Sequence, residues 1–301
     1  MENKIAEYQK RLLDWYKQNG RDLPWRKTND PYKILISEVM LQQTQVDRVM
    51  PKYFEFLEKF PTIEDLASAS NGDVLRIWSG LGYNSRALRL KAVAEEAVSV
   101  YAGKLPDNRE KLKALKGIGD YTSGAILAFA YHKPVSFIDT NIKRLVHRVF
   151  VGLELQGWRK TDKEMVKVVD EVCDFEHAYE YHQALMDLGA TICKATKLHC
   201  HICPMKEICD AYAEIKENPL VVAEKRVSYK KQGTPFKESK RYIRGGVVEY
   251  LRINAEGAGF KELYDLVNEN LREMNETELK TILGDLTREG MIKEEGGKFL
   301  L

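Results

Sequence analysis

The chain has 301 residues, of which 44% are apolar and 31% charged, with 47 basic and 45 acidic side chains. This length is enough for about two domains with a substantial core, and the composition is that of an ordinary globular protein. The balanced charge does not by itself indicate a nucleic-acid partner. No apolar run approaches the roughly 18–20 residues of a membrane span, and the mixed charge of the N-terminal residues is unlike a signal peptide.

Residues 1–212 are expected to form a mostly helical block. Apolar residues recur there at helical spacing, as at Tyr8 and Leu12, whereas the alternation typical of strands is scarce. Short turn signals separate the expected helices. Asp30 and Pro31 predict one helix start, because aspartate caps helices and proline is favoured at their first position.

A turn with two glycines, LKGIGDYTSGA at residues 115–125, separates two of these expected helices. Gly117 and Gly119 allow the chain to reverse and leave backbone N–H groups free at the start of the second helix, where an anion can bind. The pattern L-x-G-I-G is typical of the helix–hairpin–helix, which grips DNA phosphates without reading the base sequence. An ordinary helical turn with a glycine cap is the alternative.

Two acidic residues are candidates for acid–base chemistry. Asp139 follows the apolar run Val135–Ile138 and begins a helix, where capping alone would also explain an aspartate. Glu38 comes four residues after Ile34 and three after Leu35, beside an apolar stripe. A carboxyl in that position loses hydration, which predicts a raised pKa; a place at the polar edge of the stripe is the alternative.

Four of the five cysteines fall within 17 residues, with the spacing C-x6-C-x2-C-x5-C. Four thiolates from one short loop predict a [4Fe–4S] cluster in a reducing compartment. A tetrahedral zinc is the alternative, although only Cys200 and Cys203 form a short pair typical of zinc sites. The predicted ligands are Cys193, Cys200, Cys203 and Cys209, and Cys173 is expected to be a buried apolar cysteine.

The composition changes after about residue 213. Lys225–Arg244 contains eight basic residues and one acid, which favours an arm that follows DNA phosphates over an inert linker. From Gly245 to the end, seven basic residues face twelve acidic ones. The charge of this last segment fits a protein partner as well as DNA.

The last 60 residues are expected to form three helices and a hairpin. Asn275 is the expected cap of the third helix, with Glu278 completing a capping box. The hairpin covers Met291–Leu301 and turns at Gly296-Gly297. This is the element order of a winged helix. The expected helices are Arg241–Asn254, Phe260–Asn270 and Glu276–Glu289.

Four segments occur in an order and at a spacing that match a known family. They are LPWR with SEVMLQQTQ, then GIGDYTSGA, then FIDTN, and finally the cysteine loop after MDLGATIC. With them, residues 8–212 resemble the helix–hairpin–helix DNA glycosylases of the endonuclease III superfamily, and within it the MutY adenine glycosylases. SEVMLQQTQ and the GLGY of residues 80–83 are closer to MutY than to endonuclease III.

The resemblance implies a mainly all-α, two-lobed glycosylase with an iron–sulfur loop, to which the C-terminus adds a small winged-helix-like domain. The implied iron–sulfur lobe comprises residues 1–22 and 135–224, and the six-helix lobe with the hairpin comprises 23–134. A basic linker follows at 225–240 and the winged-helix-like domain at 241–301. Such an enzyme acts on double-stranded DNA with a mismatched or oxidised base pair, in the cytoplasm at the nucleoid, without membrane contact.

The resemblance also implies a role for each matched residue. Glu38 is the general acid that protonates the flipped adenine. Asp139 is the carboxylate beside the positive charge that develops on the sugar, assisted by Tyr121 and Asn141. By the same resemblance, Arg26 and Gln183 contact the base, and Gln43 and Tyr83 fill the space left by the flipped nucleotide. Thr44 lies near the opposing purine. Further DNA-binding positions are Gln42, Leu81, Gly117 and Gly119.

Tyr121 bears on the type of reaction. The lyase members of the superfamily carry a catalytic lysine at this position, and tyrosine does not form a Schiff base. We therefore expect a monofunctional glycosylase that leaves an abasic site, with at most weak strand cleavage from Lys116 or Lys143.

The chain departs from the family pattern in two places. Residues 225–301 do not resemble the Nudix-like domain with which MutY proteins help to recognise 8-oxoguanine, and Asp139-Thr140-Asn141 replaces the usual Asp-Gly-Asn. A related branch that removes thymine or uracil opposite guanine is the alternative; Gln42-Gln43-Thr44 favours adenine, since that branch tends to have basic residues there. A non-catalytic DNA-binding regulator is less favoured, because Glu38 and Asp139 are both present.

Overall fold

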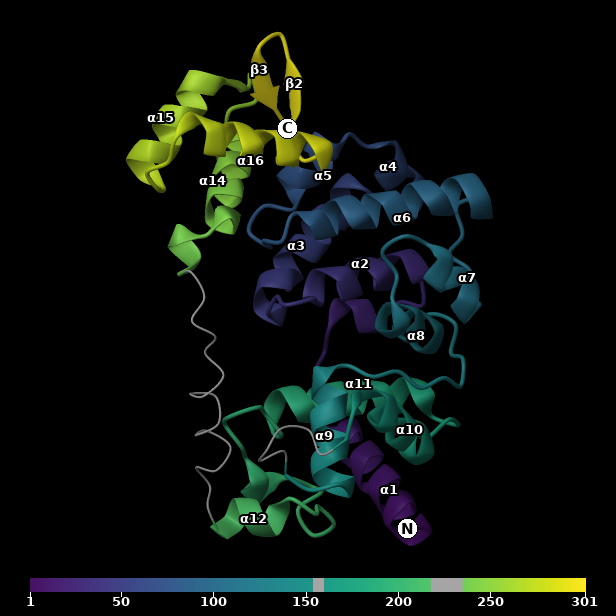
Figure 1. Cartoon of the computed structure of the whole chain (residues 1–301). Coiled ribbons are helices and arrows are strands. Elements are labelled where there is room, and N and C mark those ends of the chain that lie inside the picture. Colours follow the sequence, from purple (N-terminus) through teal and green to yellow (C-terminus); the bar gives the residue numbers. More distant parts are fainter. Residues whose placement is uncertain (154–159, 218–234) are drawn as a thin grey trace. The chain divides into compact units, whose positions relative to one another are not determined.

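The computed structural model describes residues 1–153, 160–217 and 235–301, and it is mainly helical, as expected (Figure 1). The chain folds into two compact units. One unit comprises Met1–Pro31, Asp107–Arg109 and Gly119–Lys231, and the other Tyr32–Pro106, Glu110–Ile118 and Gln232–Leu301. The predicted basic linker at 225–240 falls largely outside the described residues, and the predicted domain boundaries stay predictions.

The first unit is built around one central helix. This helix, α11, packs against α1 and α9, and the ring of Tyr181 on α11 meets the ring of Tyr8 on α1 edge to face at 6.2 Å. Both tyrosines are fully buried, so they anchor the core of the unit. The elements of the unit are α1 (Glu2–Asn19), η1 (Pro24–Arg26), α8 (Asp120–Phe129), α9 (Thr140–Phe150), α10 (Asp162–Val172), α11 (Ala178–Thr191), η2 (Cys200–Ile202) and α12 (Tyr212–Glu217).

The second unit begins with six helices, in which α6 packs against α4 and α5. The first helix starts at Pro31, as predicted, and Thr62 caps α4 in a reciprocal capping box with Asp65. Trp78 is fully buried and packs edge to face against Phe56. The helices are α2 (Pro31–Leu41), α3 (Val46–Lys59), α4 (Ile63–Ser68), α5 (Asn71–Ile77), α6 (Ser85–Tyr101) and α7 (Arg109–Ala114).

The C-terminal residues form the expected three helices and hairpin. Asn275 caps the third helix, its Oδ1 accepting a hydrogen bond of 2.9 Å from the Glu278 N–H. One further strand, β1 (Ala258–Gly259), was not predicted. It pairs with β3 (Lys298–Leu300), which also pairs with β2 (Lys293–Glu295), so the antiparallel order is β1-β3-β2. The elements are η3 (Phe236–Glu238), α14 (Lys240–Ile253), β1 (Ala258–Gly259), α15 (Phe260–Asn270), α16 (Glu276–Arg288), β2 (Lys293–Glu295) and β3 (Lys298–Leu300).

Within the second unit, the C-terminal helices and hairpin are attached to the six helices by specific contacts near α5. Arg252 of α14 donates from Nε to the Leu75 carbonyl at 3.0 Å and from Nη2 to Asn84 Oδ1 at 3.3 Å. A cation at the last turn of α5 also complements the helix dipole. Gly72 meets the chain's end so closely that a Cβ there would lie 2.7 Å from the Leu301 carbonyl oxygen.

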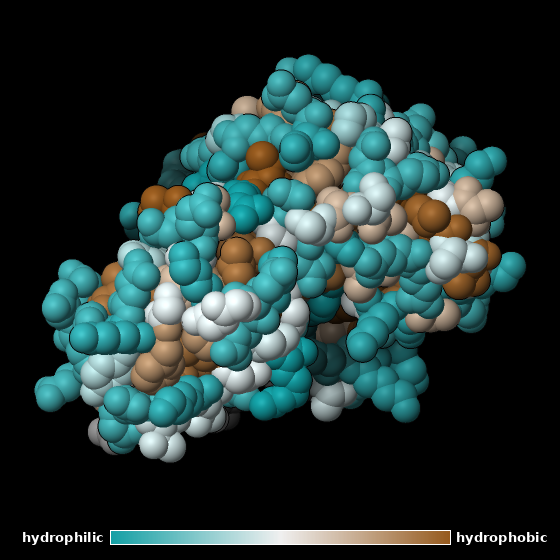
Figure 2. All heavy atoms as spheres, turned by 90° about the horizontal axis from the view of Figure 1, so that it is seen from above, coloured by the Kyte–Doolittle hydropathy of each residue, from teal (hydrophilic) through white to brown (hydrophobic). Residues whose placement is uncertain are grey.

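The surface is mostly hydrophilic on the face drawn in Figure 2, with apolar residues in small separate patches. Among the described residues, no helix has both the length and the apolar character that crossing a lipid bilayer requires.

Candidate functional site

Glu38 lies in the middle of α2 and is only 3% exposed. Every residue from Ile34 to Met40 is buried, so the carboxyl is held within an apolar stretch and does not lie at the polar edge of a helix. Carboxylates are almost never buried without a structural or chemical reason, because burial removes their hydration. This is the strongest indication of acid–base chemistry in the second unit.

Asp139 caps α9, as its position in the sequence predicts. One carboxylate oxygen accepts a hydrogen bond of 2.7 Å from the Ile142 N–H, and the other accepts one of 3.0 Å from Asn141 Nδ2. Burial raises the pKa of Asp139, although these hydrogen bonds and the charge of Arg144 oppose the rise. The first unit therefore holds a carboxylate in a fixed orientation and a partly desolvated setting.

A chain of hydrogen bonds runs from Asp139 to the cysteine loop. Asn141, which donates to Asp139, accepts in turn from Arg144 Nη2 at 2.9 Å. The same guanidinium donates from Nε to the Cys193 carbonyl at 2.8 Å and from Nη2 to the Gly189 carbonyl at 2.7 Å. Arg144 thus holds both Cys193, the first cysteine of the loop, and Asn141, the hydrogen-bond partner of Asp139.

Tyr121 lies in α8, near the segment that carries Asp139. Its ring meets that of Phe137 edge to face at 5.5 Å, and Phe137 stacks on His182 at 4.1 Å. Burial lowers the pKa of His182 to about 4, so this imidazole is neutral and serves as a packing surface at neutral pH. Sequence reasoning did not identify His182.

Arg26 forms a buried ion pair that the sequence analysis did not anticipate. Its Nη1 and Nη2 donate to both carboxylate oxygens of Asp187, at 2.8 and 2.7 Å, and Asp187 is fully buried. Burial favours a raised pKa for Asp187, but the hydrogen bonds and charge of Arg26 prevail and hold it below its ordinary value. Arg26 Nε is buried and has no hydrogen-bond partner among the described residues. The base contacts expected of Arg26 and of Gln183, which is buried on α11, stay predictions.

Two loops of the second unit carry the residues predicted to enter the duplex. Gln43 and Tyr83 both adopt left-handed backbone conformations, with φ of 59° and 47°. Side chains with a Cβ rarely adopt this conformation, which costs about 1–2 kcal/mol at each residue. Tyr83 is flanked by Gly82, whose φ of 69° suits a glycine, and its ring is 46% exposed. Strain of this kind is often stored at functional sites.

A buried arginine that sequence reasoning missed, Arg86, holds these two loops in place. Its guanidinium donates hydrogen bonds to main-chain carbonyls of both loops, and it donates one of 3.0 Å to the Thr44 hydroxyl. At the end of α2 and in the first loop, the acceptors are the carbonyls of Val39, Met40 and Gln42. In the second loop, they are the carbonyls of Leu81 and Gly82. Burial lowers the pKa of Arg86 to about 10, so the group is still charged at neutral pH.

The glycine turn before α8 agrees only partly with the prediction. Gly117 has a φ of 121°, which requires glycine, and a Cβ there would touch the Arg89 side chain at 3.4 Å. Gly119 caps α8 with an ordinary extended backbone, and a Cβ added there would meet nothing within 4 Å. No side chain caps α8 with a hydrogen bond.

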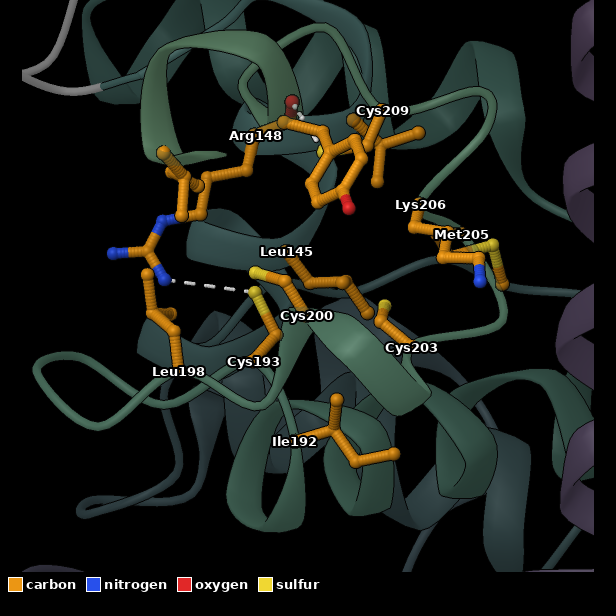
Figure 3. A pocket seen from close by; sticks show the side chains of 13 residues that line it. Leu145, Arg148, Ile192, Cys193, Leu198, Cys200, Cys203, Met205, Lys206 and Cys209 are labelled. Atoms are coloured by element: carbon orange, nitrogen blue, oxygen red, sulfur yellow. Dashed lines mark hydrogen bonds between the residues drawn. The ribbon is translucent and has the colours of Figure 1, made fainter. Parts of the chain in front are cut away.

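The four clustered cysteines line a single cavity in the first unit (Figure 3). Arg148 donates from Nη1 to Cys193 Sγ at 3.5 Å, and the Cys209 thiol donates to the Arg148 carbonyl at 3.3 Å. Within the described part of the chain, no three Cys, His, Asp or Glu side chains converge closely enough to hold one metal ion. Cys173 lies apart from them and is buried, as predicted.

Comparison with known proteins shows what the chain is similar to. Residues 36–171 match the HhH-GPD superfamily of base excision DNA repair proteins. The adenine DNA glycosylase of Mycobacterium tuberculosis is 40% identical over 195 residues, which make up 64% of this chain and 64% of that protein. Residues 36–171, which include Glu38 and Asp139, are therefore similar to the HhH-GPD superfamily.

Further proteins resemble the chain in sequence or in fold. The adenine DNA glycosylase of Rattus norvegicus is 37% identical over 226 residues, 72% of this chain but only 44% of that protein. The structure of a thermostable thymine-DNA glycosylase is 29% identical, with a TM-score of 0.66 over 71% of this chain and 98% of that one. A trapped endonuclease III–DNA intermediate, 20% identical with a TM-score of 0.63 over 72% of this chain and 99% of that one, shares the fold. The chain spans about half to two thirds of the length of the two adenine glycosylases.

Proposed function

We propose that this protein is a monofunctional adenine DNA glycosylase, which hydrolyses the N-glycosidic bond of adenine mispaired with guanine or 8-oxoguanine in double-stranded DNA. The observation that carries the proposal is Glu38, a carboxyl enclosed by a run of buried residues in a helix of the segment that is similar to the HhH-GPD superfamily. The relatives named adenine DNA glycosylase, 34–40% identical, support the choice of base.

The two carboxyls are suited to the two charges that the reaction creates. The adenine anion is a poor leaving group, so the buried Glu38 is placed to donate a proton to the base. The sugar becomes cationic, and an ionised Asp139, held by Asn141, stabilises that charge. A unit charge ~4 Å away at an effective dielectric of ~20 contributes roughly 4 kcal/mol before desolvation is counted. Tyr121 supports the segment of Asp139 through Phe137.

Base release also requires the adenine to leave the helix. Flipping costs a few kcal/mol, and a side chain that fills the vacated space offsets part of it. Gln43 and the exposed ring of Tyr83 are the residues proposed for this role, with Thr44 facing the opposing purine. The turn with Gly117 and Gly119 and the positive end of the α8 dipole are proposed to bind a backbone phosphate.

The cysteines are proposed to hold a [4Fe–4S] cluster through Cys193, Cys200, Cys203 and Cys209. Four thiols from one short loop line a single cavity, which suits a compact cluster, whereas only Cys200 and Cys203 form the short pair typical of zinc sites. When bound, the cluster supplies a cross-link that organises the loop between Cys193 and Cys209. Arg144 and Arg148 bring hydrogen-bond donors to this loop and offset the charge of the thiolates.

Removal of thymine or uracil opposite guanine is the second candidate. It is favoured by the likeness to the thermostable thymine-DNA glycosylase structure, which is 29% identical over nearly its whole length. Adenine is preferred because the relatives of higher identity carry that name and because Gln42-Gln43-Thr44 is not basic. A regulator without catalysis would not need a carboxyl buried at Glu38.

The test is single-turnover base release on four duplexes, with adenine opposite 8-oxoguanine or guanine, and thymine or uracil opposite guanine. Alkali converts each abasic site into a strand break that can be counted. Release of adenine alone supports the proposal, and the ratio of the two adenine rates shows whether 8-oxoguanine is preferred. Release of thymine or uracil instead would assign the chain to the second candidate, and no release at all would support the regulator.

A further inference from the structure

A groove of about 870 Å³ lies within the second unit, between two of its loops and the C-terminal helices. One wall consists of Gln43, Thr44, Gln45, Arg48 and Gly80–Ser85, and the other of Phe236, one face of α14 and the end of α16. Ligand sites typically enclose about 300–1,000 Å³, so the groove is large enough for a nucleotide. It includes both strained residues, Gln43 and Tyr83, whereas its C-terminal wall has no role in the reaction described above.

The charge of this groove is positive. Four arginines and two glutamates line it, and both glutamates are already paired, Glu289 with Arg244 and Glu249 with Arg252. Arg48 and Arg241 are exposed, and within the described residues no carboxylate pairs with either. Two uncompensated guanidinium groups on opposite walls of one groove match a phosphate backbone in charge.

The groove also offers aromatic surface. Phe236 is 60% exposed and Tyr83 46% exposed, and both line it. The Arg241 guanidinium lies over the Tyr83 ring, 5.5 Å from its centroid, which links the two walls. Proteins stack unpaired bases on exposed aromatic rings that lie beside arginines. The combination of rings for bases and arginines for phosphates therefore favours a nucleic acid over a protein as the ligand.

The C-terminal wall is fixed in place. Arg252, at the base of the groove, is nearly buried and bonds to Leu75 and Asn84 of the six helices. Asn71 Nδ2 donates to the Gly290 carbonyl at 2.9 Å, close to the end of α16. Direct hydrogen bonds therefore join the two walls of the groove.

We propose that this groove binds the DNA strand opposite the flipped base, with Arg48 and Arg241 on its phosphates and Phe236 beside its unpaired purine. The inference rests on the proposed function, because that function places Gln43, Thr44 and Tyr83 in the duplex where the opposing base lies. Since these residues form one wall, the opposing strand must pass along the groove. The C-terminal domain then contributes to binding of the mispair although it has no Nudix-like fold.

The test measures binding and does not depend on base release. The probe is a duplex with a tetrahydrofuran abasic analogue opposite guanine, which no glycosylase can process, bound to the full chain over a range of salt concentrations. Arg241→Ala and Arg48→Ala should each weaken binding about three-fold or more and lower the slope of log affinity against log salt by about 0.9. Phe236→Ala should weaken binding about five-fold or more. Lys261→Ala, an exposed cation of α15 outside the groove, is the matched control.

A second measurement identifies the strand. Neutral methylphosphonates next to the opposing guanine should weaken binding by the wild type but not by Arg241→Ala, because the variant has already lost that contact. The inference is overturned if the three groove variants bind like Lys261→Ala, or if the methylphosphonate effect persists in Arg241→Ala. Failure of the proposed function shows itself separately, as a wild type that binds the abasic duplex but releases no adenine.

Discussion

Arg86 Nη2 lies 2.9 Å from the main-chain oxygen of Leu81 and donates a hydrogen bond to it. Through its other donors the same buried cation also holds the Gln42 and Val39 carbonyls, so one side chain positions two loops that are about 40 residues apart in sequence. This arrangement offsets the backbone strain at Gln43 and Tyr83.

Arg86→Ala is expected to lower the free energy of unfolding by about 3 kcal/mol, since buried carbonyls lose charged donors. Release of adenine should fall more than ten-fold because the loops no longer hold their shape. Chemical denaturation and single-turnover release measure the two effects. Arg89→Ala on the same helix is the control, since Arg89 is exposed and bonds only to the Ser85 carbonyl of its own helix. Equal behaviour of the two variants would contradict the role given to Arg86.

Gln43→Gly should separate stability from activity. Glycine adopts a φ of 59° without strain, so the variant should be as stable as the wild type or more stable by up to about 1 kcal/mol. Adenine release should nevertheless drop, because the side chain proposed to fill the vacated space is gone. Thermal unfolding and release on the same preparations provide the measurement. In helical Gln18, the same change should cost about 1 kcal/mol; a similar cost at Gln43 would mean that its backbone is not strained.

Glu38→Gln keeps the shape of the side chain but removes its acid. We expect adenine release to fall by about 10²–10⁴ or more, the usual contribution of a general acid, while affinity for the abasic duplex changes little. Glu58→Gln, on the surface of α3, should leave both quantities unchanged. Wild-type release rates in Glu38→Gln would remove Glu38 from the reaction.

The ion pair of Arg26 and Asp187 should be visible in the pH dependence of stability. Because the folded-state pKa of Asp187 lies below its ordinary value of 3.8, the pair stabilises the fold fully above that value and loses this contribution as pH falls through the folded-state pKa. Asp187→Asn should cost about 3–5 kcal/mol at neutral pH, since it leaves Arg26 buried without its counter-ion. Its stability should also decline less steeply below about pH 4 than that of the wild type. If the stabilities of the wild type and of Asp187→Asn declined equally below about pH 4, the ion pair would not lower the pKa of Asp187.

Borohydride trapping tests the monofunctional assignment. Tyr121 cannot form a Schiff base, so no protein–DNA adduct should accumulate at a rate comparable to base release. Lys143 is paired with Asp162 and is mostly covered, whereas Lys116 is exposed. Any weak trapping should therefore disappear in Lys116→Gln and persist in Lys143→Gln. Rapid trapping by the wild type would show a lyase.

Local patterns in the sequence predicted the helices well. In the C-terminal domain, α15 has the expected bounds and α14 and α16 differ by a single residue at their ends, because caps such as Asn275 act on their own helix. The strand β1 was missed, since two residues carry no periodic signal and depend on pairing with β3. The roles of Asp139 as a cap and Cys173 as a buried residue were likewise local and were confirmed.

The residues that sequence reasoning missed act through distant partners. Asp187 lies 161 positions from Arg26, and no pattern near either residue predicts their ion pair. Arg86 looks like an ordinary helical cation, and only the fold brings the carbonyls of two loops to it. The pair of arginines across the groove, Arg48 and Arg241, has the same origin.

Five of the six groups that accept hydrogen bonds from Arg86 are main-chain carbonyls, which every amino acid possesses. The shape of the two loops is therefore nearly independent of the side chains at their tips. Mutation can exchange Gln42, Gln43 or Tyr83 without dismantling the scaffold that presents them. The residues at these tips can therefore vary while the arginine beneath them stays the same.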